Sequence, residues 1–332
     1  MAIVSPSFAA PALFPAVHEE SMRRLRDDLG LVPVEYPTTR SHSSPEDRAR
    51  DLVAAYADPY IRAVMATIGG EDQITVLPHL HPAVFVADPK PFVGYSDNTN
   101  LLNWLWNLGV MGLHGGSTMV HLARPGGLHP ISVGSLRTGL MHRGDLTLHP
   151  APEFSEDVND WNDPAALAHP ASTQPGHGWQ WHGPTGVVRG PTWGGNLEIL
   201  HWNLAANRWM QPNEDYQGCV LLLETSEELP SATEVSRILR NMGERGLLSQ
   251  FPAALVGLPV ATALGQTRSP SERASYREDQ ADAMATAFGK YAPDTVLVLG
   301  LDIGHTDPQW VLPYGGEMTV DASNKAITAH YG

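Results

Sequence analysis

The chain contains the run Val110-Met111-Gly112-Leu113-His114-Gly115-Gly116-Ser117-Thr118-Met119, in which an apolar segment passes through two glycines into a serine. Glycines before a serine permit the cramped backbone that lifts its hydroxyl out of a turn, and the N-terminus of a following helix favours developing negative charge. The run therefore predicts a strand, a tight turn and a helix, in the outline of a nucleophile elbow. Taken alone, a serine after two glycines is more often a helix N-cap than a nucleophile, so the role of Ser117 depends on the rest of the sequence. Because Met119 stands where the Gly-x-Ser-x-Gly pattern has its last glycine, the common α/β-hydrolase fold is not expected.

Predicted strands alternate with predicted helices before this run. Ser44, followed by Pro45 and two acids, is typical of a helix N-terminus and predicts a helix to about Ala57, while Gly30 is expected to end a helix over 17–29. Apolar segments predict strands at residues 2–5, 31–36, 63–68 and 84–87. Because strands that alternate with helices are typical of a parallel sheet, we expect an α/β fold.

The second half of the chain changes character at a segment without periodicity. Residues 145–190 are rich in Pro, Gly, His, Asn and Trp, which indicates a long linker or active-site loop. Strands near 218–224, 253–257 and 295–301 and a helix over 231–245 then predict a second α/β unit. We therefore expect an N-terminal domain over 1–150, a linker over 151–190 and a C-terminal domain over 191–332.

Composition narrows the class of protein. A length of 332 residues and a hydrophobic content of 42% favour two folded domains, and the formal net charge of −15 argues against binding nucleic acid through its phosphates. The single cysteine, Cys219, lies in an apolar run and is expected to be buried rather than catalytic. Without a long apolar run or a basic leader, the protein is expected in the cytoplasm, with no membrane partner.

Six short motifs occur in one order along the chain. They are Ile68-Gly69-Gly70-Glu71-Asp72, Phe92-Val93-Gly94-Tyr95-Ser96-Asp97-Asn98-Thr99, His114-Gly115-Gly116-Ser117, Gly194-Gly195-Asn196-Leu197, Leu222-Leu223-Glu224 and Gly304-His305. In this order they resemble the LD-carboxypeptidase family of serine peptidases, which includes the microcin-C immunity peptidases. The resemblance covers nearly the whole chain, as far as Pro313-Tyr314-Gly315.

The resemblance implies a catalytic triad of Ser117, Glu224 and His305. A serine hydroxyl is a poor nucleophile until an imidazole accepts its proton, and a carboxylate holds the imidazole in the correct tautomer. The family also implies an oxyanion hole made by the backbone amides of Gly70 and Thr118, and Glu71 is expected to bind substrate. The implied fold is a flavodoxin-like (class I glutamine-amidotransferase-like) parallel-sheet domain plus a smaller C-terminal α/β domain. Members of the family commonly form homodimers, so the resemblance also implies a homodimer.

Two other groups of residues have simpler interpretations. Tyr95-Ser96-Asp97 precedes a predicted helix, so N-capping by Ser96 or Asp97 is expected. The chain has 15 histidines, but no zinc-binding spacing occurs, so His79 and His81 are interpreted as structural. No metal and no cofactor are expected.

The sequence leaves two substrates possible, and in both the bond that is cut is an amide. The immunity branch cuts the amide of a peptidyl- or aminoacyl-nucleotide, whereas an LD-carboxypeptidase releases the terminal D-amino acid from a cytoplasmic murein peptide. Trp179 and Trp181 favour the nucleotide, because the immunity branch has a nucleobase-contacting tryptophan in the equivalent region, although both could instead cap the core of the second domain. A non-catalytic binding protein is the alternative from another class.

Overall fold

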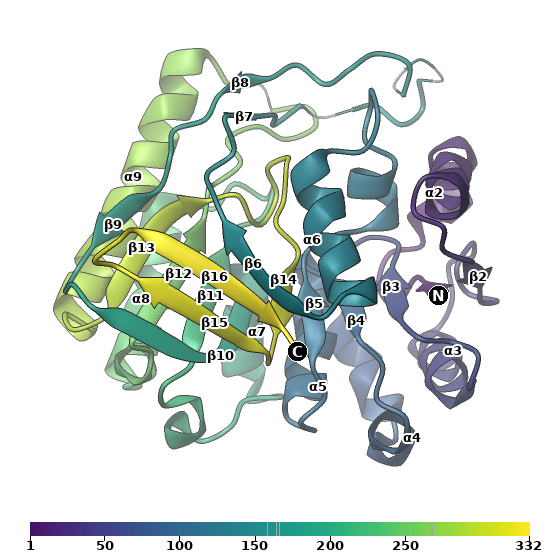
Figure 1. Ribbon diagram of the computed structural model, residues 1–332, viewed down its shortest axis with the longest axis horizontal. Helices are drawn as coiled ribbons and strands as arrows, with labels where there is room; N and C mark the ends of the chain where they lie inside the picture. The colour runs from purple at the N-terminus through teal and green to yellow at the C-terminus, as the bar shows by residue number, and fades with distance from the viewer. Residues whose placement is uncertain (158, 164, 166, 267) are drawn as a thin grey trace. The chain divides into compact units, whose positions relative to one another are not determined.

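The computed structural model describes residues 1–157, 159–163, 165, 167–266 and 268–332. The chain forms two compact units. The first comprises Met1–His142, Asn159–Ala171 and Trp310–Gly315, and the second comprises Arg143–Val158, Ser172–Gln309 and Gly316–Gly332. Each unit has a sheet of its own (Figure 1). In the described part of the chain, no helix has both the length and the apolar character needed to span a membrane.

The sheet of the first unit has the strand order of flavodoxin-like proteins. Its strands are β1 (Ala2–Val4), β2 (Val34–Glu35), β3 (Val64–Ala66), β4 (Phe92–Gly94), β5 (Gly112–His114) and β14 (Leu312–Tyr314). The order is β14-β5-β4-β3-β1-β2, with every pair parallel except the antiparallel β14 and β5. The order 2-1-3-4-5 is that of flavodoxin-like folds, which place ligands beyond the carboxyl ends of the strands. The predicted fold class is therefore confirmed.

Helices lie between these strands along the chain, and one more helix follows β5. They are α1 (Ala10–Leu13), α2 (Pro15–Asp27), α3 (Pro45–Ala57), α4 (Pro82–Ala87), α5 (Thr99–Trp106) and α6 (Pro130–Met141), with 3₁₀ turns at Gln73–Thr75, Leu77–His79 and Ser96–Asn98. The start of α3 is as predicted, because the Ser44 side chain accepts a hydrogen bond from the Asp47 amide and Pro45 is the first helical residue. Gly30 follows α2 with a φ of 68°, as expected for a residue that ends a helix.

The predicted strand over Val84–Ala87 is wrong, because these residues belong to helix α4. Valine and phenylalanine favour strands when considered locally, but Pro82 fixes the first turn of a helix. In this helix only Phe85 is fully buried, packing against Tyr56 and Trp104. The strand of this region is instead β4, eight residues after Val84.

The second unit contains a mixed sheet of eight strands. Its order is β6-β16-β15-β10-β11-β12-β13-β9, in which the four strands from β10 to β13 are parallel. Their bounds are β6 Gly144–Leu148, β9 Gln180–His182, β10 Val187–Asn196, β11 Val220–Glu224, β12 Ala253–Gly257, β13 Val296–Leu301, β15 Glu317–Asp321 and β16 Ala326–Tyr331. In Figure 1 the yellow strands β15 and β16 lie between β10 and β6. The predicted strands near 218–224, 253–257 and 295–301 are thus confirmed.

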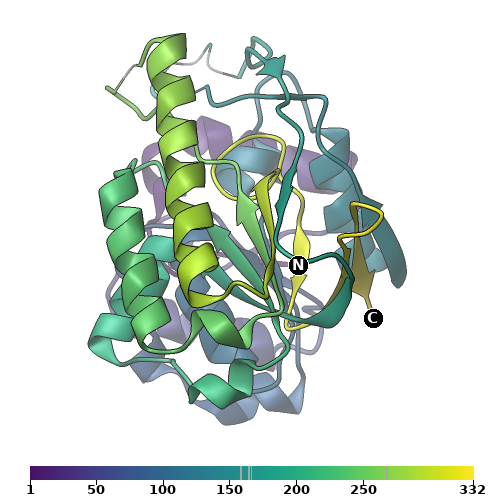
Figure 2. The same cartoon turned by 90° about the vertical axis from the view of Figure 1, so that its left-hand side faces the viewer.

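Helices α7 (Leu197–Ala206), α8 (Ala232–Glu244) and α9 (Pro270–Tyr291) belong to the second unit, with 3₁₀ turns at Asn213–Tyr216 and Leu248–Gln250. Figure 2 shows α8 and α9 as two green helices that lie side by side. Ser231 begins α8 with a capping box to Glu234, which confirms the predicted helix. The core of this unit includes the rings of Trp193 and Phe251, which are stacked, and that of Tyr216, which is tilted against both.

Residues 145–190 contain more regular structure than a linker. Strand β6 pairs with β16, and β9 forms the edge of the sheet beside β13. Between them, β7 (Glu153–Phe154) pairs with β8 (Gln174–Pro175). The compact units do not follow the expected ranges residue by residue, since 159–171 and 310–315 belong to the first unit, and the second unit is not the smaller one.

Candidate active site

Ser117 lies immediately beyond the carboxyl end of β5. Gly115 and Gly116 precede it with φ values of 114° and 76°, which L side chains rarely adopt, so the two glycines permit the turn. The predicted helix that follows is a single π-helical turn over Thr118–Leu122, and Ser117 caps it by accepting a hydrogen bond from the Val120 amide at 3.2 Å. The hydroxyl is 1% exposed and lies 3.5 Å from Nδ1 of His121. Ser117 is therefore both a helix cap and a candidate nucleophile.

The predicted oxyanion-hole amides come from two loops at the same edge of the sheet. Gly70 follows β3, and Thr118 follows Ser117. The Met119 amide donates to the Thr67 carbonyl at 3.0 Å and ties the second loop to the first. Within the described residues, no protein acceptor is recorded for the amides of Gly70 and Thr118, so both remain candidates to bind an oxyanion.

The interpretation of Ser96 and Asp97 as helix caps is wrong. Neither the 3₁₀ turn over Ser96–Asn98 nor helix α5 begins with a side-chain cap. Asp97 is instead buried and accepts hydrogen bonds from the Ser7 hydroxyl, from the Gln73 amide at 2.9 Å and from the Asn100 side chain at 2.8 Å. Burial raises the pKa of Asp97. This carboxyl cross-links the loops that follow β1, β3 and β4, among them the loop that carries Gly70.

Glu224 and His305 are brought together within the second unit. Glu224 ends the buried strand β11 and is 1% exposed, and its Oε2 accepts a 2.7 Å hydrogen bond from Nδ1 of His305. Because Nδ1 is held in this way, Nε2 is the nitrogen that a serine proton would reach. The imidazole is therefore oriented as a serine hydrolase requires of its general base.

Gly304 permits the close approach of the histidine loop to Glu224. Its φ is 90°, and a Cβ at this position would lie 2.7 Å from Cβ and 3.0 Å from Oε2 of Glu224. A side chain here would strain the backbone and push the carboxylate away from His305. The Gly304-His305 motif thus has a direct physical reason.

We expect Gly304→Ala to lower stability by about 1–3 kcal/mol, because of the left-handed backbone. Displacing Glu224 should also lower kcat/KM by about a hundredfold, the effect of a small misplacement of a catalytic group. Thermal unfolding and initial rates measure the two effects. The control is Gly289→Ala in helix α9, where a Cβ meets nothing within 4 Å and alanine favours the helix. An unchanged rate in Gly304→Ala would contradict this role of the close contact.

Glu227 is a residue of the site that the sequence analysis missed. Its Oε2 lies 2.9 Å from Nε2 of His305, although its side chain is 63% exposed. Burial of the imidazole works against its charged form, but Glu224 and Glu227 outweigh burial and raise the pKa of His305 well above 6.5. The positive imidazolium in turn lowers the pKa of Glu227 to about 2. The two carboxylates on either side of the ring therefore favour the charged form of His305.

Glu198, at the start of α7, is a third carboxyl in this part of the unit. Its Oε1 accepts hydrogen bonds from the amide and the hydroxyl of Ser226, at 2.9 and 2.6 Å. Burial raises the pKa of Glu198, and the negative charge of Glu224 adds to the increase. Glu198 thus anchors the backbone between Glu224 and Glu227.

The predicted substrate-binding residues have different surroundings. Trp179 is half-buried, and its indole N–H donates to Asp302 at 3.1 Å. Trp181 is half-buried in the edge strand β9, opposite Val298 of β13. Glu71 is exposed in the loop after β3.

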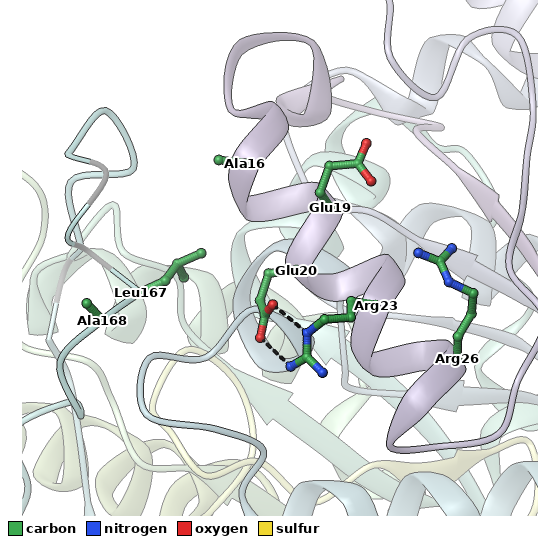
Figure 3. A pocket seen from close by; sticks show the side chains of 7 residues that line it. All are labelled: Ala16, Glu19, Glu20, Arg23, Arg26, Leu167 and Ala168. Atoms are coloured by element: carbon green, nitrogen blue, oxygen red, sulfur yellow. Dashed lines mark hydrogen bonds and ion pairs between the residues drawn. The ribbon is translucent and has the colours of Figure 1, made fainter.

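Two other features do not contribute to this chemistry. Cys219 is buried as predicted, and burial raises the pKa of its thiol to about 11, which keeps it protonated and unreactive. A surface pocket in the first unit lies between α2 and the segment with Leu167 and Ala168 (Figure 3). Its charged groups come from α2, where Arg23 pairs with Glu20 at 2.7 Å, and none of the predicted site residues lines it.

Comparisons with known proteins identify relatives of both halves of the chain. The model of the LD-carboxypeptidase N-terminal domain matches residues 1–115, two residues short of Ser117, and that of the LD-carboxypeptidase C-terminal domain matches residues 189–320. The Escherichia coli microcin C7 self-immunity protein MccF is 26% identical over 287 residues, which is 85% of this chain and 78% of MccF.

Solved structures show the same fold. An MccF-like protein from Streptococcus pneumoniae, determined in complex with AMP, has a TM-score of 0.86 and 24% identity over 99% of this chain and 98% of its own. MccF in complex with aspartyl sulfamoyl adenosine has a TM-score of 0.83 and 23% identity over 99% of this chain and 96% of its own.

Proposed function

Because the chain belongs to the LD-carboxypeptidase family of serine peptidases, we propose that it hydrolyses the C-terminal amide of an aminoacyl- or peptidyl-nucleotide, with Ser117, His305 and Glu224 as its catalytic triad. The observation that carries this proposal is the buried 2.7 Å pair of Glu224 and His305, which leaves Nε2 as the base. The proposed triad is of the Ser-His-Glu type.

The chemistry proceeds through an acyl-enzyme. Nε2 of neutral His305 takes the proton of the Ser117 hydroxyl as its oxygen attacks the scissile carbonyl, and the amides of Gly70 and Thr118 donate to the oxyanion. The imidazolium, stabilised by Glu224, then protonates the leaving nitrogen as the C–N bond breaks. A water molecule, deprotonated by His305, hydrolyses the ester and restores Ser117.

Support for a nucleotide comes from the relatives and from two tryptophans. MccF and an MccF-like protein have been crystallised with aspartyl sulfamoyl adenosine and with AMP. In this chain the ring of Trp179 is held by Asp302, and neither Trp179 nor Trp181 is fully buried. Half-buried indoles offer a face on which a nucleobase stacks, and such stacking contributes about 1–3 kcal/mol per base.

The test compares Trp179→Ala and Trp181→Ala on an aminoacyl sulfamoyl adenosine and on a murein tetrapeptide. We expect at least one substitution to raise KM for the nucleotide by about tenfold to a hundredfold, with little change on the peptide, because only the nucleotide has a base to stack. Trp202→Ala is the matched control, because Trp202 is 45% exposed on α7 of the same unit.

Melting temperatures separate stacking from packing. If both variants melt early and lose activity equally on the two substrates, the tryptophans belong to the core and an LD-carboxypeptidase acting on murein peptides becomes the better proposal. If the wild type binds the nucleotide but turns over neither substrate and resists serine-reactive phosphonates, the protein is a binding protein.

A further inference from the structure

The carboxylate of Glu227 pairs with Nε2 of His305, the nitrogen that must accept a proton in the proposed mechanism. Nδ1 of His305 donates to Glu224, so Nε2 must accept the proton of the nucleophile in the proposed mechanism. Glu227 Oε2 lies 2.9 Å from this same Nε2. A proton shared between Nε2 and a carboxylate keeps the imidazole positively charged, and an imidazolium cannot accept the proton of Ser117. Glu227 thus holds the resting base in an unproductive state.

The charges around His305 favour this state. Glu224 approaches from the end of β11 and Glu227 from the following loop. Glu198 of α7 binds Ser226, which lies between them in the chain. Burial works against the charged form of His305, and the carboxylates of Glu224 and Glu227 favour it. Removing the influence of one carboxylate lowers the pKa of His305 and favours the neutral imidazole.

The side chain of Glu227 can pair with a different cation, whereas the backbone before it is anchored. Glu198 anchors Ser226 by two hydrogen bonds, and this residue directly precedes Glu227. The Glu227 side chain is 63% exposed, in contrast to the buried Glu224. An exposed carboxylate on an anchored backbone can exchange one ion-pair partner for another at small cost.

We propose that Glu227 recognises an ammonium group next to the scissile carbonyl of the substrate and, by pairing with it, releases His305 to act as the base. This inference rests on the proposed function, because an aminoacyl group carries its ammonium two bonds from the reacting carbon. Nε2 must come within hydrogen-bond distance of the oxygen that attacks this carbon, so a carboxylate beside Nε2 is within reach of the ammonium. The proton that leaves His305 passes to water, and the neutral imidazole then serves Ser117.

The proposal narrows the substrate class of the proposed function to aminoacyl-nucleotides, since it requires a free α-amine. The test uses alanyl sulfamoyl adenosine and its N-acetyl derivative, which lacks the positive charge, with the wild type, Glu227→Gln and Glu228→Gln. Glu228 is the matched control, because it is the next residue, is exposed and makes its recorded contact through its backbone amide.

We expect the wild type and Glu228→Gln to prefer the free amine in kcat/KM by about tenfold to a hundredfold, the effect of one charge-assisted hydrogen bond. Glu227→Gln should lose this preference. Its activity should also persist to lower pH, by on the order of one unit, because removing a carboxylate lowers the pKa of His305. A purely structural role for Glu227 would lower the melting temperature without changing the preference or the pH profile.

Two results would overturn the proposal: equal hydrolysis of both compounds by the wild type, or a Glu227→Gln enzyme that keeps the preference. If neither the wild type nor the variants turn over either compound, the proposed function fails instead. A binding measurement then tests the role of Glu227 by itself. Calorimetry on Ser117→Ala protein should then show tighter binding of the free amine only when Glu227 is present, and equal binding with and without Glu227 rejects its role.

Discussion

Ser117→Ala is expected to abolish hydrolysis, with a loss of about a million-fold in kcat, the effect of removing the nucleophile of a catalytic triad. The protein should remain folded and bind substrate. Because Ser117 also accepts a hydrogen bond from the Val120 amide, the variant should lose about 1 kcal/mol of stability, as is typical of a lost N-cap. Single-turnover kinetics and thermal unfolding measure the two effects separately.

The matched control is Ser44→Ala. Ser44 also caps a helix and accepts a hydrogen bond from an amide three residues ahead, at 3.2 Å, but it lies at the start of α3 and is part of no proposed chemistry. We expect a similar decrease in melting temperature, of about 2–4 °C, and an unchanged rate. Substantial turnover by Ser117→Ala would exclude Ser117 as the nucleophile.

Local chemistry in the sequence predicted much of the fold. The cap at Ser44, the proline after it and the glycine at position 30 act within one turn of backbone, so their effect does not depend on distant residues. The strand at β11 was equally clear, because four consecutive apolar residues follow Cys219 and precede Glu224. The same logic would have found α9, where Ser269 and Glu272 form a capping box around Pro270.

Tertiary context decided where sequence patterns failed. Residues 84–87 have strand propensity, yet they form a helix that begins at Pro82 and buries Phe85 against Tyr56 and Trp104. Strand β14 joins the first sheet by pairing with β5, almost 200 residues earlier in the chain, and no local pattern indicates such a partner. Asp97 resembles a cap in sequence but links three loops that converge only after the sheet has formed.

Some residues of the candidate site were predictable from sequence motifs, and others were found only in the folded structure. Gly304 and His305 were recognised because a motif marks them, and the structure supplies the reason in the contact with Glu224. Glu227 lies in a polar loop next to another glutamate, a pattern typical of solvent-exposed residues. Its importance depends on a distance to a histidine 78 positions later, which only the folded chain determines.

Glu224→Gln is expected to lower kcat by about ten-thousandfold, because an amide in place of the carboxylate favours the wrong tautomer of His305 and does not stabilise the imidazolium. The geometry should survive, since the two side chains have nearly the same shape. The pH profile should change as well. His305 must be neutral to accept the serine proton, so the rate falls as the pH decreases through the pKa of His305.

In the wild type this decrease should begin above the ordinary histidine range, because Glu224 and Glu227 raise the pKa of His305 well above 6.5. Removing the charge of Glu224 lowers that pKa, so the residual activity of Glu224→Gln should persist to lower pH than that of the wild type. Glu228→Gln, on the same loop, should keep the wild-type rate and profile. A fully active Glu224→Gln enzyme, or a wild-type profile that stays flat down to pH 4, would show that this carboxylate does not support the catalytic base.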